Sequence, residues 1–362
     1  MVDPALRDHV CRYGHNATAY QTLNAGFEHA WFGDAVVGYV RARAWPAGPG
    51  VWVAAGVPIG PPRAVGPAVA AFDASARARR ARAVWFGVEA DEVWHFPHHA
   101  ALVVGAQPVW APGEWGETLA AHASLRAQVR RAANKGVEVD EWPVARAAAH
   151  PGLRRCLREW TQSRGLPALR FLTDPFVLDH LGDRRVFVAQ QAGSVVAYAV
   201  LAPVPARDGW LAEWLIQGAV APNGTAARLL DAAMRAVAAE GAAYVTLGLA
   251  PLSSTSPPSA SPPPLVVRAL LAWTRAHARR FYNFEGLERF KAKFRPVAWE
   301  PVRLCTDEAR VSLATLYALA DAFAGGRSPV GLVGEAVLGA AADETKTTLG
   351  AARRVVSSRP GS

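Results

Sequence analysis

The fold of this 362-residue chain is decided by residues 209–226, which read GWLAEWLIQGAVAPNGTA. The apolar, Trp-containing run Gly209–Gln217 predicts a β-strand. Pro222–Gly224 then forms a turn, and the sequence of Thr225–Glu240 predicts a helix that the turn opens. A strand that leads through a glycine-containing loop into a helix is a unit of α/β folds, and such a loop offers backbone N–H groups to an anion.

Similar elements are predicted in the same order in both halves of the chain. In the first half we expect two strands, a helix and a strand at Ala35–Trp45, Gly50–Val57, Val65–Arg82 and Ala83–Glu89. In the second half we expect a hairpin, a strand, a helix and a strand at Val186–Gln190, Val195–Pro203, Gly209–Gln217, Thr225–Glu240 and Ala243–Leu249. This order predicts a duplicated α/β (α+β) fold.

Length and composition suggest the domain organisation. A chain of 362 residues suits two domains of about 150–180 residues with an extension. We expect domains at residues 1–145 and 146–305, followed by a helical, partly disordered tail at residues 306–362 with a helix over Glu308–Phe323. Because 51% of the residues are hydrophobic, a wholly disordered chain is excluded.

Charge and cysteine content limit the partners and the compartment. The 39 Lys and Arg residues exceed the 30 Asp and Glu residues, and the net charge of +9 suits a polyanionic partner such as nucleic acid or an anionic membrane surface. The three cysteines are far apart, which favours reduced thiols. We expect no signal peptide and no transmembrane segment, hence a cytoplasmic protein with at most peripheral contact with the inner membrane face.

The Pro222–Gly224 loop has two interpretations. CoA-dependent N-acetyltransferases bind pyrophosphate with a Q/R-x-x-G-x-G/A loop at this place, and that pattern would need Gln or Arg where the sequence has Ala221. In the other interpretation, Asn223 is a helix N-cap and Gly224 is a turn residue.

A basic helix is predicted over Leu119–Lys135, closed by Gly136. Its basic residues lie on neighbouring turns and are Arg126, Arg130, Arg131 and Lys135. Because no acidic residue interrupts them, this face could bind phosphates. The alternative is an ordinary solvated helix face.

A second basic block, residues 279–295, reads RRFYNFEGLERFKAKFR. Phe290 and Phe294 are four residues apart and should pack inward. An ammonium group from Lys291 or Lys293 beside these aromatic rings would suit the stabilisation of an oxyanion. The alternative is a basic surface helix. No metal site is expected, because the histidines in Trp94–His99 match no metal-binding spacing.

The order of several short motifs resembles the DUF2156 family, and in particular the soluble C-terminal catalytic region of bacterial phosphatidylglycerol lysyltransferases. The matching segments are Gly56–Pro61, Leu125–Val137, Trp160, Ala221–Gly224, Leu247–Ser253, Phe281–Phe294 and Trp299–Arg303. The block from Phe281 to Arg303 is the most specific of them.

What the resemblance implies is two tandem acetyltransferase-like (GNAT-like) domains that move an aminoacyl group from aminoacyl-tRNA to an acceptor hydroxyl or amine. The acceptor is a phosphatidylglycerol-type lipid or a soluble small molecule. Aminoacyl-tRNA is the co-substrate, and no other cofactor is implied. The sequence departs from the family pattern at Val57, where the family often has Asp, and at Gln217, where it often has Arg.

The resemblance and the motifs together suggest roles for individual residues. The family's acidic residue before the P-N-G loop corresponds to Glu213, which would orient or deprotonate the nucleophile. The family lysine falls on Lys291, with Lys293 as a neighbouring candidate, and would stabilise the oxyanion. The expected substrate-binding residues are Gln217, Asn223, Gly224, Ser253 and Asn283. The expected tRNA-binding residues are Arg126, Arg130, Arg131, Lys135 and Arg289.

Two other functions are compatible with the sequence. One is a CoA-dependent N-acyltransferase on the same fold, which the incomplete cradle at Asn223 and Gly224 keeps open. The other is a tRNA- or nucleic-acid-binding relative without catalysis, which the departures at Val57 and Gln217 suggest.

Overall fold

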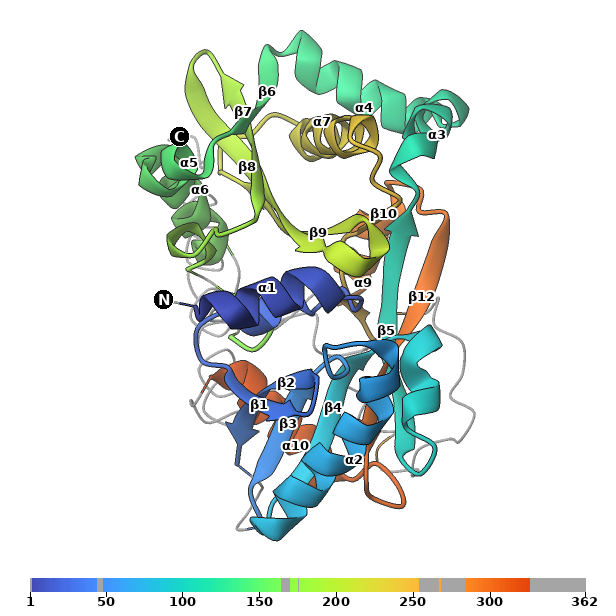
Figure 1. The fold of residues 1–362 in the computed structure, drawn as a ribbon. Helices are drawn as coiled ribbons and strands as arrows, with labels where there is room; N and C mark the ends of the chain where they lie inside the picture. Colours follow the sequence, from blue (N-terminus) through green and yellow to red (C-terminus); the bar gives the residue numbers. More distant parts are fainter. Residues whose placement is uncertain are drawn as a thin grey trace, which may run out of the picture.

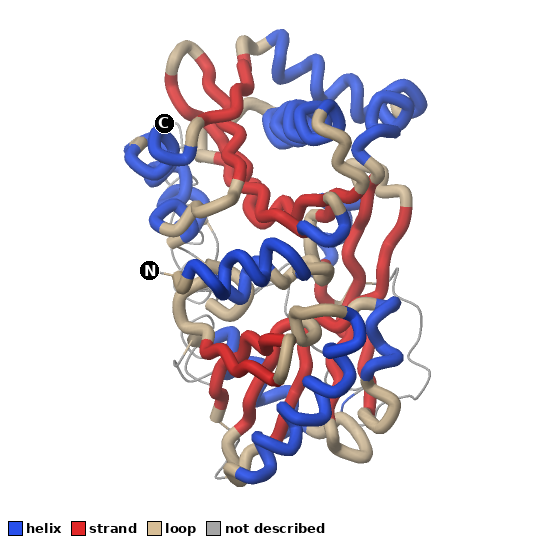
Figure 2. Tube along the Cα trace, viewed as in Figure 1, coloured by secondary structure: helices blue, strands red, loops and turns tan. Residues whose placement is uncertain are grey.

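The computed structural model describes residues 2–43, 48–163, 170–174, 176–253, 267 and 284–325. Within these residues the strands form one mixed sheet of twelve strands. Figure 1 shows this sheet passing from a lower, N-terminal half into an upper half, and Figure 2 shows helices packed around it in both.

The elements of the first half are given in chain order. The helices are α1 (Pro4–Tyr13), α2 (Pro62–Ala78), α3 (Trp115–Ala121) and α4 (Ala123–Asn134), with the 3₁₀ turns η1 (Tyr20–Leu23), η2 (Ala90–His95) and η3 (Pro112–Glu114). The strands are β1 (Glu28–Phe32), β2 (Ala35–Ala42), β3 (Val51–Ala55), β4 (Arg82–Val88) and β5 (Ala100–Trp110).

The second half and the extension follow. The helices are α5 (Val144–Ala149), α6 (Pro151–Gln162), α7 (Thr225–Ala239), α9 (Phe284–Ala292) and α10 (Leu313–Ala324), with the 3₁₀ turns η4 (Val177–Asp179) and η5 (Pro205–Arg207). The strands are β6 (Val137–Trp142), β7 (Arg185–Gln191), β8 (Ser194–Val204), β9 (Gly209–Gln217), β10 (Tyr244–Thr246), β11 (Ala250–Pro251) and β12 (Ala298–Thr306).

The predicted α/β class with two similar halves is confirmed by the topology. In the first half β1, β2 and β3 are antiparallel, and β3 is parallel to β4 through the crossover helix α2. In the second half β7, β8 and β9 are antiparallel, and β9 is parallel to β10 through α7. Parallel neighbours need such a crossover, so each half is a mixed sheet with flanking helices.

Alternation along the strands explains why helices cover both faces. In β3, Val51 and Val53 belong to the cluster that includes α10, whereas Trp52 and Ala54 belong to the cluster that includes α2. Successive strand residues point to opposite faces, so a run of five buried residues requires a layer on each side.

The two halves share their central strands. The sheet order is β1-β2-β3-β4-β12-β5-β10-β9-β8-β7-β6, with β11 paired to β5 beside this path. β12 follows the second half in the sequence but pairs antiparallel with β4 and β5. In Figure 1, β5 and β12 run side by side from one half to the other. The domain limits at residues 145 and 305 therefore stay predictions.

The N-terminal helix α1 lies between the two halves (Figure 1). Its Leu6 and Val10 share a buried cluster with Ile59 of the first half and Leu211 of the second. This packing makes the N-terminal segment a contact between the halves.

Neither β5 nor β12 was expected from the sequence. Each contains a proline, Pro108 in β5 and Pro301 in β12, and an internal proline argues against a central strand. In the sheet, Pro108 lies opposite Trp299 and Pro301 lies opposite Ala106.

The predicted helix over Leu119–Lys135 is in fact two helices. His122 has an extended backbone that separates α3 from α4. Arg126 reaches back across this break, and its Nη1 donates to the carbonyl of Leu119 at 2.7 Å. One of the expected tRNA-binding arginines thus also satisfies the end of α3.

The predicted helical extension is confirmed as α10. This helix packs on the first half, where its buried Asp321 accepts a hydrogen bond from Arg43 Nη2 at 2.8 Å. Residues 326–362 of the expected tail lie outside the described residues. Among the described helices, none combines the length and the apolar character that a membrane span requires.

Candidate functional site

The candidate site lies where β9 and β10 separate. Their pairing extends only from Gly209 to Leu211, opposite Tyr244 to Thr246. Beyond it, β9 continues to Gln217, whereas the chain after β10 has left the pairing. Ligands of α/β sheets commonly bind at the carboxyl ends of parallel strands, where neighbouring segments separate. We call the place where the two backbones diverge the β9–β10 crevice; side chains fill part of it, since a Cβ on Gly248 would lie 3.1 Å from Leu211 Cδ1.

Lys291 of α9 holds the segment that leaves β10. Its Nζ donates to the carbonyl oxygens of Leu247, Gly248 and Leu249 at 2.8, 2.7 and 2.9 Å. Gly248 has a left-handed backbone (φ 70°), which lets three successive carbonyls face one point. Lys291 is therefore the centre of a rigid turn beside the crevice.

The three acceptors of Lys291 bear on its ionisation. Burial lowers the pKa of Lys291 to about 7. In the opposite direction, the carbonyls favour the charged ammonium, because only that form has three N–H groups to donate. In this arrangement none of these N–H groups is left for an oxyanion.

Glu213 occupies a β-bulge in β9. The register of β8 with β9 pairs Val200 with Trp214 and Leu201 with Ala212, so Glu213 is the extra residue between them. Bulges re-aim one side chain and are frequent beside active sites. The bulge directs Glu213 differently from its strand neighbours.

The carboxylate of Glu213 forms a buried ion pair. Only 1% of its side chain is exposed, and Arg184 Nε donates to it at 2.8 Å while Gln21 Nε2 donates at 3.1 Å. Arg184 Nη2 also donates to Asn24 Oδ1 at 2.7 Å, and its guanidinium lies over the ring of Tyr20. Residues from the N-terminal segment thus complete the surroundings of a glutamate from the second half.

The P-N-G loop fits neither of its two interpretations fully. Gly224, not Asn223, is the N-cap of α7, and within the described part of the chain no side chain caps this helix. Gly224 has φ 98°, and a Cβ there would lie 2.2 Å from the backbone oxygen of Gln128 in α4. Glycine is required by this close approach. Asn223 is exposed.

Several N–H groups of the loop are already engaged in hydrogen bonds. The N–H groups of Gly218, Ala219, Ala221 and Thr225 already donate to Val196 O, Glu159 Oε2, Gly218 O and Pro222 O. A pyrophosphate would have to be bound by the N–H groups that remain. The loop therefore gives little support to CoA binding.

The basic residues of α4 form a continuous surface. Arg130, Arg131 and Lys135 are exposed, and no hydrogen bond or ion pair connects their side chains with other residues of the described ranges. Together with Arg126 and Asn134 they line a surface hollow of about 540 Å³. The opposite side of α4 is buried on α7. The hollow is thus a concentration of unneutralised positive charge, which we call the α4 basic surface.

Of the two other basic candidates, Arg289 lies on α9 and Lys293 directly follows it. Arg289 is exposed and forms an ion pair with Glu285 one turn earlier. Lys293 Nζ lies over the rings of Phe290 and Phe294, 4.2 and 4.9 Å from their centroids. Burial lowers the pKa of Lys293. Neither side chain joins Lys291 at the carbonyl oxygens of Leu247–Leu249.

The remaining candidates are the expected substrate-binding residues Gln217, Ser253 and Asn283. Gln217 is half-buried at the end of β9, where it pairs with Ala197. Ser253 is buried just after β11. Asn283 lies outside the described residues. Gln217 therefore lies on the crevice strand, four residues after Glu213.

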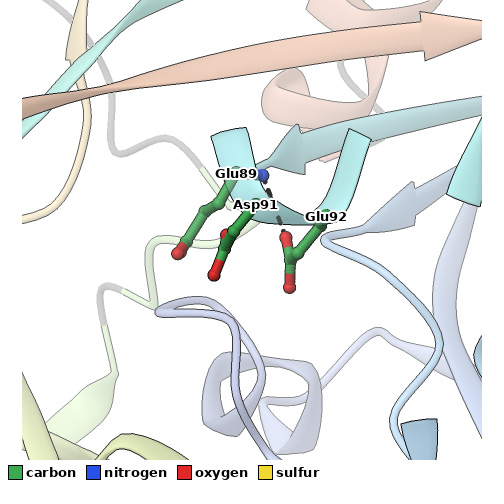
Figure 3. Close-up of side chains that lie close together, drawn as sticks. All are labelled: Glu89, Asp91 and Glu92. Atoms are coloured by element: carbon green, nitrogen blue, oxygen red, sulfur yellow. Dashed lines mark hydrogen bonds between the residues drawn. The ribbon is translucent and has the colours of Figure 1, made fainter. Parts of the chain in front are cut away.

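A compact acidic group at η2 was not anticipated from the sequence. One carboxylate oxygen from each of Glu89, Asp91 and Glu92 lies within 4.8 Å of the others (Figure 3). Burial, followed by the charge of Glu92, raises the pKa of Glu89 to about 8. However, the two oxygens of Glu89 already accept from Ala17 N and Arg207 Nη1 at 2.8 and 2.7 Å. Glu89 therefore takes part in contacts between the two halves, through Ala17 and Arg207. These contacts explain the acidic group better than a metal ion does.

Sequence reasoning missed Arg184, Gln21 and Asn24. Arg184 is 29 residues from Glu213, and Gln21 is 192 residues from it. The only local signal is that Arg184 directly precedes the apolar strand β7. A charge next to a buried strand often needs a buried partner, but the partner cannot be identified from spacing.

Comparison with protein families gives one match. The family model described as "Phosphatidylglycerol lysyltransferase, C-terminal" matches residues 7–306. The comparison with curated proteins gives no match.

Solved structures show the same fold. The C-terminal DUF2156 domain from Agrobacterium fabrum, assigned to a lysylphosphatidylglycerol synthetase, is 24% identical with a TM-score of 0.73, over 89% of this chain and 96% of that one. The structure of L-PGS from Bacillus licheniformis is 18% identical with a TM-score of 0.73, over 90% and 98%. A Bacteroides thetaiotaomicron protein of unknown function is 13% identical with a TM-score of 0.57, over 84% and 100%.

Proposed function

This chain belongs to the phosphatidylglycerol lysyltransferase C-terminal family, a family of acyl-group transferases, and on that basis we propose that it is an aminoacyl-tRNA-dependent aminoacyltransferase. The acceptor is a hydroxyl or amine on a phosphatidylglycerol-type lipid or on a soluble small molecule. The family match over residues 7–306 carries the proposal. The α4 basic surface supports it, because it offers charge to a polyanion.

The proposed reaction is an acyl transfer. The acceptor oxygen or nitrogen attacks the ester carbonyl of the aminoacyl-tRNA, and a new acyl bond forms. The ester bond to the terminal ribose of the tRNA breaks, and the proton lost by the acceptor ends on the ribose oxygen. Such a step benefits from a fixed geometry and from groups that favour the developing negative charge.

The geometry favours positioning roles for the two residues expected to be catalytic. Glu213 accepts from Arg184 and Gln21, which suits an orienting role better than proton transfer. Lys291 holds Leu247–Leu249 and so maintains one wall of the β9–β10 crevice. We propose that both residues act by fixing the crevice in which the acyl group is transferred.

A direct test is a transfer assay with the full chain. tRNA charged with a radiolabelled amino acid, tested for each amino acid in turn, is incubated with phosphatidylglycerol vesicles in one arm and with a small-molecule cell extract in the other. We expect label to leave the tRNA and appear in a lipid or a soluble product, and the arm identifies the acceptor class. Absence of transfer in both arms for every amino acid contradicts the proposal.

The rival functions give different results in companion measurements. A CoA-dependent acyltransferase predicts that acetyl-CoA raises the melting temperature of the protein. A non-catalytic relative predicts salt-dependent tRNA binding without transfer. We expect transfer, and no thermal stabilisation by acetyl-CoA.

The α4 basic surface predicts a specific salt dependence. Replacing Arg130, Arg131 and Lys135 together with alanine should weaken tRNA binding by about 10-fold or more at low salt and reduce the slope of log K against log [salt] by about 2–3. The reason is that each cation at a phosphate releases a counterion. Fluorescence anisotropy with labelled tRNA at several salt concentrations measures both quantities.

The matched control removes the same charge elsewhere. Arg63, Arg158 and Arg310 are exposed at scattered places on the surface, so their combined replacement with alanine changes the net charge equally. We expect the control to keep most of the wild-type slope. Equal losses in the two triple variants would show that net charge, not the α4 basic surface, attracts the tRNA.

A further inference from the structure

Residues 14–24 contact both halves of the molecule, and we call them the connecting segment. Asn16 holds the segment to the first half, because its Nδ2 donates to Glu92 Oε2 at 2.7 Å. Gln21 reaches the second half, where its Nε2 donates to Glu213 Oε1 at 3.1 Å. The connecting segment therefore links the acidic group at η2 to the glutamate beside the β9–β10 crevice.

Glu92 lacks one hydrogen-bond donor. Only 5% of this residue is exposed. Its Oε2 accepts from Asn16 and from the backbone N–H of Glu89, whereas its Oε1 is buried and has no partner within the described ranges. Arg207 does not supply the donor, because its guanidinium pairs with Glu89 and Glu300 at 2.7 and 3.1 Å. A buried carboxylate oxygen without a donor is unfavourable, so this position favours a positive charge beside it.

The imidazole ring of His15, in the connecting segment, faces this position. Its Nδ1 lies 3.8 Å from Glu92 Oε1, and its Nε2 lies 3.8 Å from Asp91 Oδ2. Figure 3 shows that the side chains of Asp91 and Glu92 point to the same side of η2. A neutral imidazole has one N–H group and the imidazolium has two, so only the charged ring offers a donor to both carboxylates. Because 42% of the His15 side chain is exposed, its proton can exchange with water.

The charges around His15 favour its protonated form. Interaction with Glu92 raises the pKa of His15 and the charge of Asp91 acts in the same direction, while burial and the charge of Arg207 oppose them. The pKa of the neighbouring Glu89 is raised as well, to about 8. A raised pKa means that the folded protein binds a proton more tightly than the unfolded chain does. The contribution of both groups to stability is therefore lost as the pH rises through their pKa values in the folded protein.

We propose that His15 is a proton-dependent clamp, whose imidazolium binds Glu92 and Asp91 and thereby fixes the connecting segment. When the proton leaves, the buried Glu92 carboxylate has no cationic partner, which favours its movement toward water and away from Asn16. The segment then holds Gln21 less firmly, and Glu213 loses part of its orienting contact. The clamp acts on the joint between the halves and does not depend on which group is transferred in the crevice.

Hydrogen exchange of the full chain at pH 6 and pH 9 tests the clamp. The backbone N–H groups of Ala17 and Gln21 report on the connecting segment, because they donate to Glu89 Oε1 and Thr18 O at 2.8 and 3.0 Å. After correction for intrinsic exchange rates, we expect the protection of both amides to be about 3- to 5-fold lower at pH 9, while β8 is equally protected at both pH values. Equal protection of Ala17 at the two pH values overturns the proposal.

Two substitutions of similar size separate the charge of His15 from the packing of its ring. In His15→Gln, protection at pH 6 should be about 3- to 5-fold below that of the wild type, and the two proteins should agree at pH 9, where the wild-type ring is neutral. Glu92→Gln keeps an oxygen acceptor for Asn16 but removes the charge, so protection should stay high at both pH values. If His15→Gln differs from the wild type equally at pH 6 and pH 9, packing and not charge is responsible, and the clamp is wrong.

His98→Gln is the matched control, because it removes an exposed imidazole from the loop after η2. It should match the wild type at both pH values, and an effect equal to that of His15→Gln would contradict a specific role of His15. The link to the crevice has its own readout. If Ala17 responds to pH while Gln21 does not, the clamp stops short of Glu213 and that part of the proposal fails.

An NMR titration of the histidine ring signals gives an independent measurement. The signal that is missing from His15→Gln belongs to His15, and its pKa should lie above the ordinary value in the wild type and fall in Glu92→Gln. A pKa of His15 that Glu92→Gln leaves unchanged overturns the pairing. None of these experiments uses tRNA, so the clamp and the proposed aminoacyl transfer can fail independently.

Discussion

Replacing Arg184 with methionine should lower the free energy of unfolding by about 3–5 kcal/mol. The substitution keeps most of the side-chain volume but leaves Glu213 buried without its guanidinium. It also removes the donor to Asn24 Oδ1. Urea unfolding followed by tryptophan fluorescence measures the change, and the transfer assay should show that activity is lost with it.

A double-mutant cycle identifies the cause of this loss. Adding Glu213→Gln to Arg184→Met should restore part of the stability, because the uncompensated carboxylate becomes neutral. Arg154→Met is the matched control, since its pair with Asp179 at 2.6 Å is about 40% exposed on both sides and should contribute less than about 1 kcal/mol. Equal effects of Arg184→Met and Arg154→Met would mean that the buried pair contributes no more to stability than an exposed pair.

Replacing Lys291 with methionine should reduce aminoacyl transfer by about 100-fold or more, because the crevice wall at Leu247–Leu249 loses its anchor. Three carbonyls lose their donor, and each unsatisfied buried acceptor costs about 1–3 kcal/mol. Removal of a buried ammonium offsets part of this cost. Hydrogen exchange should therefore become faster for the amides of residues 247–253 while the strands of the first half stay protected.

Lys293→Met is the natural control for this experiment. Lys293 directly follows α9 and contacts the rings of Phe290 and Phe294, a contact worth about 0.5–1 kcal/mol. We expect it to leave the exchange of residues 247–253 close to that of the wild type. If Lys291→Met preserves both the exchange rates and the transfer rate, Lys291 does not position the crevice.

Much of the fold could be predicted because its signals are local. The apolar, Trp-containing run Gly209–Gln217 and the turn at Pro222–Gly224 correctly indicated β9 and the start of α7. The strands β5 and β12 were missed because Pro108 and Pro301 contradict the local pattern of a central strand. The two strands pair with each other although they are distant in the sequence.

The candidate site was predictable only in part. Glu213 and Lys291 were singled out by family motifs, and both lie beside the β9–β10 crevice. Their hydrogen-bond partners were not predictable. Gln21 is 192 residues from Glu213, and Leu247 is 44 residues from Lys291.

The sequence by itself determined the class of fold, the repeated order of elements and the positions of the basic helix and the motif residues. These properties depend on periodicity, turn residues and charge within a few neighbouring residues. The tertiary structure alone decided that Lys291 donates to three carbonyls and that Glu213 is enclosed by Arg184 and Gln21. Hydrogen bonds and buried ion pairs depend on direction and on exclusion of water, and both are established only when distant segments pack together.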